Sequence, residues 1–110
     1  MSRIICYDSD GNKLNNLVQW DKNPLLLISG VPVEPAPECH FYNKYSKVSI
    51  PLTPEISNGR LMVRVPTELL QYDLPISISF YYTYQDESSS TEYTITIPVY
   101  PKPMPDGASR

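Results

Sequence analysis

The chain has 110 residues and a formal net charge of −3, which suits one small domain with one modest core. Its nine lysines and arginines are scattered along the chain, so the basic surface expected of a DNA- or RNA-binding domain is missing. No stretch approaches the roughly 20 apolar residues that span a bilayer, and the first residues do not resemble a signal peptide. The composition therefore argues against nucleic-acid and membrane partners and predicts folding in a cytoplasm.

Proline and cysteine usage further restrict the fold. The chain has twelve prolines against four glycines, and because proline interrupts helices and sheet ladders, we expect it at strand ends, edges and connections. Cys6 and Cys39 are enough for one disulfide, but in a reducing compartment we expect free, buried thiols.

The first part of the chain predicts short strands. Residues 3–8 are β-prone and run into the turn cluster 8–12, which predicts a hairpin with a return strand over residues 13–20. Trp20 is expected to be the largest single contributor to the core. The apolar run 25–29 suits a strand that is buried on both faces.

The middle of the chain predicts a crossing between sheets and further strands. Residues 31–37 contain three prolines and should be extended, at the surface or at a sheet edge. Strands are expected at 40–43, 48–53 and 60–65, the last preceded by the hairpin signal Asn58-Gly59. A short helical turn is expected near Thr67–Gln71, with Thr67 as a possible cap.

The last third predicts a long hairpin from two alternating runs, 75–85 and 91–100. One face of this hairpin is apolar and should anchor the core; it comprises Ile76, Ile78, Phe80, Tyr82, Tyr84, Tyr93, Ile95, Ile97 and Val99. The opposite face is polar but flat and β-branched, which is compatible with solvent or with a neighbouring subunit. As core anchors of the whole domain we take Trp20, Ile78, Phe80, Tyr82, Ile95 and Ile97.

About seven or eight short strands with regular turn signals predict an all-β fold. The expected architecture is an antiparallel β-sandwich of immunoglobulin-like type over residues 1–100, without the Cys…Trp…Cys signature of antibody domains. A small closed barrel is the alternative. Residues 101–110 are expected to be a proline-rich exit tail.

Motifs for catalysis and metal binding are weak. The run Asp8-Ser9-Asp10-Gly11-Asn12 is similar to a calcium loop, but its glycine comes too early, so we predict a plain turn. His40 is the sole histidine, and the adjacent Cys39 should point to the other face of the strand, where it cannot pair with His40 as a nucleophile. We therefore predict a protein without catalytic residues, metal or cofactor; an enzyme built around His40 is the minor rival.

Interface candidates come from tyrosines outside the predicted core. Tyr81 and Tyr100 qualify because tyrosine is enriched where protein surfaces meet. Thr83, on the flat face, and the extended Pro101 and Pro103 complete the candidate protein interface.

Several short pieces of the sequence occur together in the order of a known protein group. They are Ile5-Cys6-Tyr7-Asp8 with Asp10-Gly11-Asn12, Gln19-Trp20-Asp21, Pro35-Ala36-Pro37 with His40-Phe41-Tyr42-Asn43, Val65-Pro66 with Leu69-Leu70-Gln71, and Ile95-Thr96-Ile97-Pro98-Val99 with Pro101-Lys102-Pro103. In these pieces the chain resembles the N-terminal β-domain of virion fibre proteins from phages and prophages of Gram-positive gut bacteria, of the baseplate upper protein, tail fibre or head fibre type.

The resemblance implies a phage structural protein. Such domains precede a coiled-coil, collagen-like or receptor-binding region and attach it to the particle; a short subunit decorating a capsid or tail is also compatible. The implied partners are other virion proteins, with a homo-oligomer expected, and the implied location is the virion, assembled in the bacterial cytoplasm. The alternative function is a carbohydrate-binding module for the host surface, for which a β-sandwich with surface aromatics is a suitable scaffold.

Overall fold

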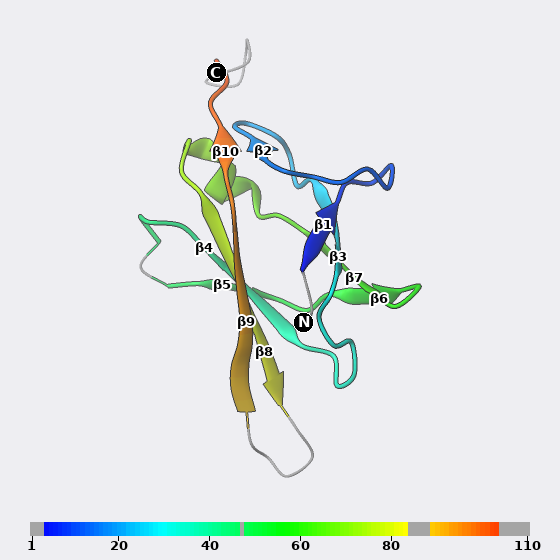
Figure 1. The fold of residues 1–110 in the computed structure, drawn as a ribbon. Helices are drawn as coiled ribbons and strands as arrows, with labels where there is room; N and C mark the ends of the chain where they lie inside the picture. The colour runs from blue at the N-terminus through cyan, green and yellow to red at the C-terminus, as the bar shows by residue number, and fades with distance from the viewer. Residues whose placement is uncertain (1–3, 47, 84–88, 104–110) are drawn as a thin grey trace.

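The computed structural model describes residues 4–46, 48–83 and 89–103, with backbone alone over 89–92 (Figure 1). The described residues form short strands and one 3-10 helix, η1. In chain order they are β1 (Ile5–Tyr7), β2 (Leu17–Val18), β3 (Leu25–Ser29), β4 (Glu38–Tyr42), β5 (Ile50–Leu52), β6 (Glu55–Ser57), β7 (Arg60–Arg64), η1 (Thr67–Gln71), β8 (Ile76–Thr83), β9 (Ser89–Ile97) and β10 (Val99–Tyr100).

The strands form two antiparallel sheets and a small parallel pair. The first sheet has the order β1-β3-β7-β6 and the second has the order β5-β4-β8-β9. β10 pairs in parallel with β2. The prediction of an all-β fold with antiparallel sheets is confirmed.

One core lies between the two sheets. Leu26, Ile28 and Leu61 of the first sheet belong to the same buried cluster as Phe41 and Phe80 of the second. Side chains that alternate along each strand supply this cluster, as expected when one face of each sheet is buried. The fold is therefore β-sandwich-like.

The predicted core anchors do not all lie in this cluster. Ile78, Phe80, Tyr82 and Ile97 are buried, and Ile95 is partly buried at the margin of the core. Trp20 lies outside the core and is only half-buried, so its expected role as the largest core contributor is wrong.

The wrong prediction for Trp20 follows from a wrong prediction of the second strand. The predicted return strand over 13–20 meets β1 through a single bridge between Tyr7 and Lys13. β1 instead pairs with β3, and the later part of the segment, β2, pairs with β10. A strand that changes partner no longer follows the alternation of the first hairpin, and Trp20 is therefore not part of the core cluster.

The central strand of the first sheet also differs from its prediction. β3 lies between β1 and β7, yet only Leu26 and Ile28 are buried, while Leu25, Leu27 and Ser29 are half-buried. One face of the strand contacts the core and the other is partly open to solvent, so burial on both faces is wrong.

The connections between strands agree better with the predictions from the sequence. The proline-rich segment carries the chain from β3 in the first sheet to β4 in the second, and Tyr82 donates a 2.7 Å hydrogen bond to the carbonyl of Pro32. Asn58 and Gly59 adopt positive φ values of 52° and 75° between β6 and β7, as a tight hairpin turn requires.

The helical turn is confirmed at Thr67–Gln71 as η1, but its cap differs. Pro66 occupies the N-cap position and no side chain caps the helix. The hydroxyl of Thr67 instead contacts the side chain of Asn23 and accepts a hydrogen bond from the Asn23 amide. Thr67 therefore links η1 to the loop before β3 and does not cap the helix.

The long terminal hairpin is confirmed as β8 and β9, with a register irregularity between Phe80 and Tyr81. Its predicted second strand is interrupted, because β9 ends at Ile97 and β10 begins at Val99. Pro98 between them has no N–H to continue the ladder. Tyr84 lies outside the described residues.

Candidate functional site

The predicted interface residues form two separate surfaces. Tyr81 is 43% exposed and Tyr100 is 57% exposed; Thr83, Pro101 and Pro103 are exposed as well. Tyr81 pairs with Thr91 on β9, and the extended chain from Thr91 to Tyr100 spans roughly 30 Å at about 3.3 Å per residue. Tyr81 lies near the end of β8 and Tyr100 lies in β10, so the two are far apart along the chain of β9 and β10. Figure 1 shows β10 and the hairpin ends of β8 and β9 at opposite ends of the domain.

The exit segment, residues 99–103, is held by main-chain hydrogen bonds. The amide of Leu17 donates to the carbonyl of Pro98 at 2.8 Å, and the amide of Gln19 donates to that of Tyr100 at 2.9 Å. These bonds form the parallel β2–β10 pair, which joins residues about 80 positions apart in the chain.

Two side chains extend this attachment beyond the strand pair. The indole Nε1 of Trp20 donates to the carbonyl of Lys102 at 2.9 Å. The side-chain Oε1 of Gln19 accepts the Lys102 amide at 3.2 Å, and Nε2 of the same side chain donates to the carbonyl of Gln71 at 3.0 Å. We call Gln19 and Trp20 the exit clamp, because together they fix the chain path as far as Lys102.

The exit clamp has an unusual backbone. Trp20 has a φ of +73°, a conformation that bulky L-residues rarely adopt and that costs on the order of 1–3 kcal/mol. Its amide donates to the carbonyl of Leu70 at 2.8 Å, which ties the strained residue to η1 and to the buried core.

Sequence reasoning missed the role of this clamp. Tyr100, Pro101 and Pro103 were expected at an exit, but Trp20 was expected in the core and Gln19 had no expected role. No local signal marked it, because Val18-Gln19-Trp20-Asp21 alternates apolar and polar residues as a half-buried strand does.

The second surface is the outer face of the second sheet, formed by alternate residues that point away from the core. Hydroxyl groups form cross-strand contacts there, with Ser79 Oγ 3.1 Å from Thr94 Oγ1 and Ser77 Oγ 3.2 Å from Thr96 Oγ1. The outer face comprises Glu38, His40, Tyr42, Ser77, Ser79, Tyr81, Thr83, Thr94 and Thr96.

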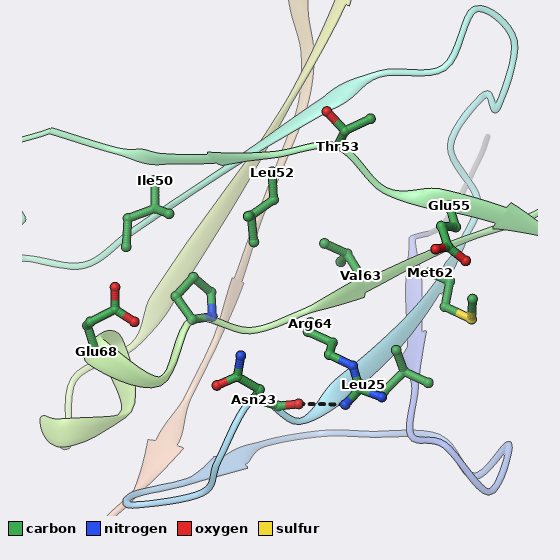
Figure 2. A pocket seen from close by; sticks show the side chains of 11 residues that line it. Asn23, Leu25, Ile50, Leu52, Thr53, Glu55, Met62, Val63, Arg64 and Glu68 are labelled. Atoms are coloured by element: carbon green, nitrogen blue, oxygen red, sulfur yellow. Dashed lines mark hydrogen bonds between the residues drawn. The ribbon is translucent and has the colours of Figure 1, made fainter.

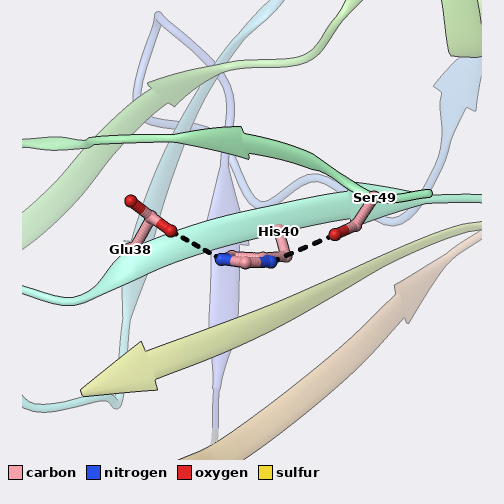
Figure 3. Close-up of polar contacts among 3 residues, drawn as sticks. All are labelled: Glu38, His40 and Ser49. Carbon is pink, nitrogen blue, oxygen red and sulfur yellow. Dashed lines mark hydrogen bonds and ion pairs between the residues drawn. The ribbon is translucent and has the colours of Figure 1, made fainter. Parts of the chain in front are cut away.

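His40 lies within this outer face between two polar partners (Figure 3). Its Nε2 is 2.7 Å from Oε1 of Glu38, and its Nδ1 is 3.1 Å from Oγ of Ser49. The imidazole also lies against the ring of Tyr81, with centroids 4.8 Å apart. Beside these rings is a shallow pocket of about 380 Å³, lined by Ala36, Pro37, Glu38, His40, Thr53, Tyr81 and Thr83.

The contacts of His40 have the connectivity of a Ser-His-Glu triad, which the sequence did not predict. Acyl transfer also needs a substrate site that reaches the serine and donors for an oxyanion. The pocket beside His40 is not lined by Ser49, and Glu38 is 52% exposed on the surface. The geometry shows a histidine that is hydrogen-bonded at the surface of the sheet.

A larger cleft of about 520 Å³ lies where the edge of the second sheet meets the first sheet. In Figure 2, Ile50 and Leu52 point from β5 toward Val63 on β7, giving the cleft an apolar interior. Charged residues lie around it, and Nη1 of Arg64 donates to the carbonyl of Asn23 at 3.0 Å. The cleft can accept a small apolar side chain, but nothing in its lining singles out a ligand.

The two cysteines are free and buried, as predicted. Burial raises the pKa of Cys6 to about 11. Burial, together with the nearby charge of Glu38, raises the pKa of Cys39 to about 12. Both thiols are therefore protonated near neutral pH and are poor nucleophiles.

The acidic segment near the N-terminus forms the predicted turn. Oδ1 of Asp8 accepts the amides of Asp10 and Asn12 at 2.9 and 3.0 Å, and Gly11 supplies a φ of +84°. Among residues 4–46, 48–83 and 89–103, no three His, Cys, Asp or Glu side chains come together in a metal-binding arrangement. In the same residues no helix has the length and hydrophobicity needed to cross a membrane.

No family model matches the sequence, and neither curated proteins nor solved structures show significant similarity to it. The likeness to virion fibre domains therefore rests on the ordered sequence pieces alone.

Proposed function

We propose that the chain is a phage structural protein that serves as the virion-attachment domain of a tail, baseplate or head fibre, or as a short subunit that decorates a capsid or tail. In this proposal the sandwich-like domain is of immunoglobulin-like architecture and binds other virion proteins. The ordered sequence pieces shared with fibre domains support the assignment, together with the path of the exit segment.

The exit clamp is the observation that carries the proposal. A domain that attaches a fibre must fix the direction in which the chain leaves, because a freely rotating joint would not orient the fibre. Here the departing chain is held by the β2–β10 pair and by two side-chain hydrogen bonds to Lys102, one with Trp20 and one with Gln19. A third bond, from Gln19 to the carbonyl of Gln71, ties the clamp to η1.

The outer face of the second sheet is the proposed docking surface for the particle. It carries hydroxyl groups in cross-strand rows and presents Tyr81 at 43% exposure. Tyrosine on a flat surface supplies contact area with little loss of side-chain entropy. In this proposal the particle binds near Tyr81, and the chain leaves at the opposite end of the β9–β10 strand.

Association with particles tests the proposal. Phage particles induced from the source strain are purified on a density gradient, and the chain is quantified in them by mass spectrometry. We expect it in the particle fraction in stoichiometric amount, and we expect Tyr81→Ala to reduce its binding to particles. A chain that stays in the soluble fraction while other virion proteins sediment would contradict the proposal.

A second candidate function, a carbohydrate-binding module, is favoured by one observation. The shallow pocket beside His40 combines the exposed ring of Tyr81 with the carboxylate of Glu38, and sugars bind to an aromatic surface flanked by polar groups. Glycan-array binding that is lost in Tyr81→Ala and kept in Tyr100→Ala would support it, because Tyr100 is also exposed but lies far from the pocket. An array without any binding would remove this candidate.

A further inference from the structure

The turn between β6 and β7 contains Asn58-Gly59, the single Asn-Gly pair of the chain. The two residues adopt φ values of 52° and 75°, and Ser57 pairs with Arg60 on either side of them. A two-residue turn of this kind favours asparagine and glycine, because both central residues need a positive φ. The pair that suits the turn is also the one in which asparagine is most reactive, since glycine has no side chain to shield its amide.

This turn is open to solvent. Asn58 and Gly59 are both exposed, and apart from its chain neighbours no heavy atom lies within 4 Å of the position that a Cβ of Gly59 would occupy. Figure 1 shows the turn projecting from the first sheet, away from the rest of the domain. Water therefore reaches both the side chain of Asn58 and the amide of Gly59.

The amide of Gly59 is not engaged in the hairpin ladder. Among the residues that the structure describes, it has no backbone acceptor. The amide of Gly11, which follows Asp10 in the turn near the N-terminus, instead donates to the carbonyl of Asp8 at 3.0 Å. The Gly59 nitrogen can thus approach a neighbouring carbonyl carbon without losing a hydrogen bond.

The strand before the turn is weakly held. β6 has three residues and forms an edge of the first sheet, next to β7, and Ile56 at its centre is 46% exposed. Short segments with few buried contacts open locally at a low cost in free energy. Such opening lets Asn58 leave its turn conformation and bring its side-chain carbonyl carbon against the Gly59 nitrogen.

We propose that Asn58 is a modification site, at which the side-chain amide is converted to a carboxylate without an enzyme. The Gly59 nitrogen forms a bond to Cγ of Asn58 and gives up its proton, and the side-chain nitrogen leaves as ammonia, so that a cyclic imide closes. Water then opens the imide. Opening at the Cγ carbonyl yields aspartate, and opening at the main-chain carbonyl yields isoaspartate, in which the chain continues through the side chain.

Water is the sole co-reactant of this conversion. Each event consumes one water and releases one ammonia, and nothing is oxidised or reduced. The proposal goes beyond the attachment function and does not depend on it, because the purified chain in buffer contains every reactant.

The two products should affect the turn differently. Aspartate, like asparagine, tolerates a positive φ, so the hairpin keeps its shape and gains a negative charge. Isoaspartate adds a backbone carbon to a turn whose ends are fixed by the pairing of Ser57 with Arg60. A two-residue turn cannot accept this atom without disturbing the pairing, so isoaspartate should weaken β6.

Peptide mass spectrometry after storage tests the site. The folded chain is kept in mildly alkaline buffer, where the attacking amide is deprotonated more often, and is digested with trypsin at successive times beside an unstored sample. Residues 48–60 form one tryptic peptide, in which Asn58 is the sole asparagine. We expect this peptide to gain the mass change of deamidation, faster as the pH rises, and to separate into two products of equal mass.

Asn43 provides a comparison within the same chain. It is buried, its Oδ1 accepts hydrogen bonds from the amides of Tyr45 and Ser46, and Lys44 rather than glycine follows it. We expect Asn58 to react at least about tenfold faster than Asn43, because Asn43 must first lose both hydrogen bonds. Equal rates at the two positions would contradict the reasoning from exposure and from the Gly59 amide.

Two variants and a reference peptide complete the test. Asn58→Gly removes the side-chain amide and still permits a positive φ, so its peptide 48–60 should keep its mass. Asn58→Asp supplies the aspartate product, which should elute with one of the two wild-type products. A synthetic peptide 48–60, stored in parallel, shows the reaction without the fold. If that peptide is converted while Asn58 of the folded chain stays unmodified, the turn protects the asparagine and the proposal is overturned.

Discussion

Replacing Trp20 by phenylalanine tests whether the exit clamp, rather than the core, is where this residue acts. The substitution keeps an aromatic ring but removes the indole N–H that donates to the carbonyl of Lys102 at 2.9 Å. An intramolecular hydrogen bond contributes a net of about 0.5–1.5 kcal/mol. Because Lys102 is exposed, water can replace the lost donor, and the cost should be about 0.5–1 kcal/mol, confined to the β2–β10 pair.

Amide hydrogen exchange measures this local cost. The amides of Leu17 and Gln19 donate across the pair to Pro98 and Tyr100, so their exchange reports its opening. A loss of about 1 kcal/mol raises their exchange rates roughly fivefold. The amide of Leu14, which bonds to β1 instead, should exchange as in wild type.

Two further variants define the result. Gln19→Ala removes both side-chain bonds of that residue and should have the larger effect. Tyr72→Phe, at an exposed ring next to η1, should change nothing. If Trp20→Phe accelerates exchange equally throughout the sheets, the tryptophan supports global stability and the clamp interpretation is refuted.

Other residues give four more predictions. Tyr82→Phe leaves the carbonyl of Pro32 without its 2.7 Å donor and should lower the free energy of unfolding by about 1–2 kcal/mol in urea titrations; no change would show that water replaces the hydroxyl. Gly59→Ala, at a φ of +75° with open space around the glycine, should cost about 1–2 kcal/mol through backbone strain alone, whereas Gly59→Asn should cost less; equal losses would contradict a purely conformational cause. The raised pKa values of Cys6 and Cys39, about 11 and 12, mean that the folded state holds its thiol protons more tightly than the unfolded state. The thiols should therefore react with iodoacetamide at pH 8 only after unfolding, and stability should be constant below about pH 9 and fall as the pH rises toward 11–12; fast native-state labelling would disprove this. Finally, a fluorophosphonate probe should not label Ser49, and labelling that His40→Ala abolishes would instead support an enzyme.

The fold class and the terminal hairpin could be predicted because their signals are local. Alternation over residues 75–83 and the Asn58-Gly59 pair determine strand and turn without reference to the rest of the chain. Burial of Ile78, Phe80 and Tyr82 follows directly from that alternation.

Partners distant in sequence could not be predicted in the same way. The pairing of β2 with β10 joins Leu17 to Val99, and no local pattern in either segment specifies the other. Trp20 was misplaced for this reason, since a large aromatic residue is usually a core residue unless a distant carbonyl satisfies its N–H. The contact of His40 with Ser49 likewise depends on how β4 and the segment before β5 come together.

The strained backbone of Trp20 argues that the exit clamp is a selected feature rather than a by-product of folding. A positive φ at a bulky residue lowers stability by on the order of 1–3 kcal/mol, and glycine at this position would avoid that cost. Glycine would also remove the indole that reaches Lys102. The side-chain hydrogen bond of Trp20, at about 0.5–1.5 kcal/mol, offsets part of the strain and holds the path of residues 99–102. Glycine would relieve the strain but would lose the indole donor to Lys102, so tryptophan at this position favours a held exit segment, as the proposed attachment role requires.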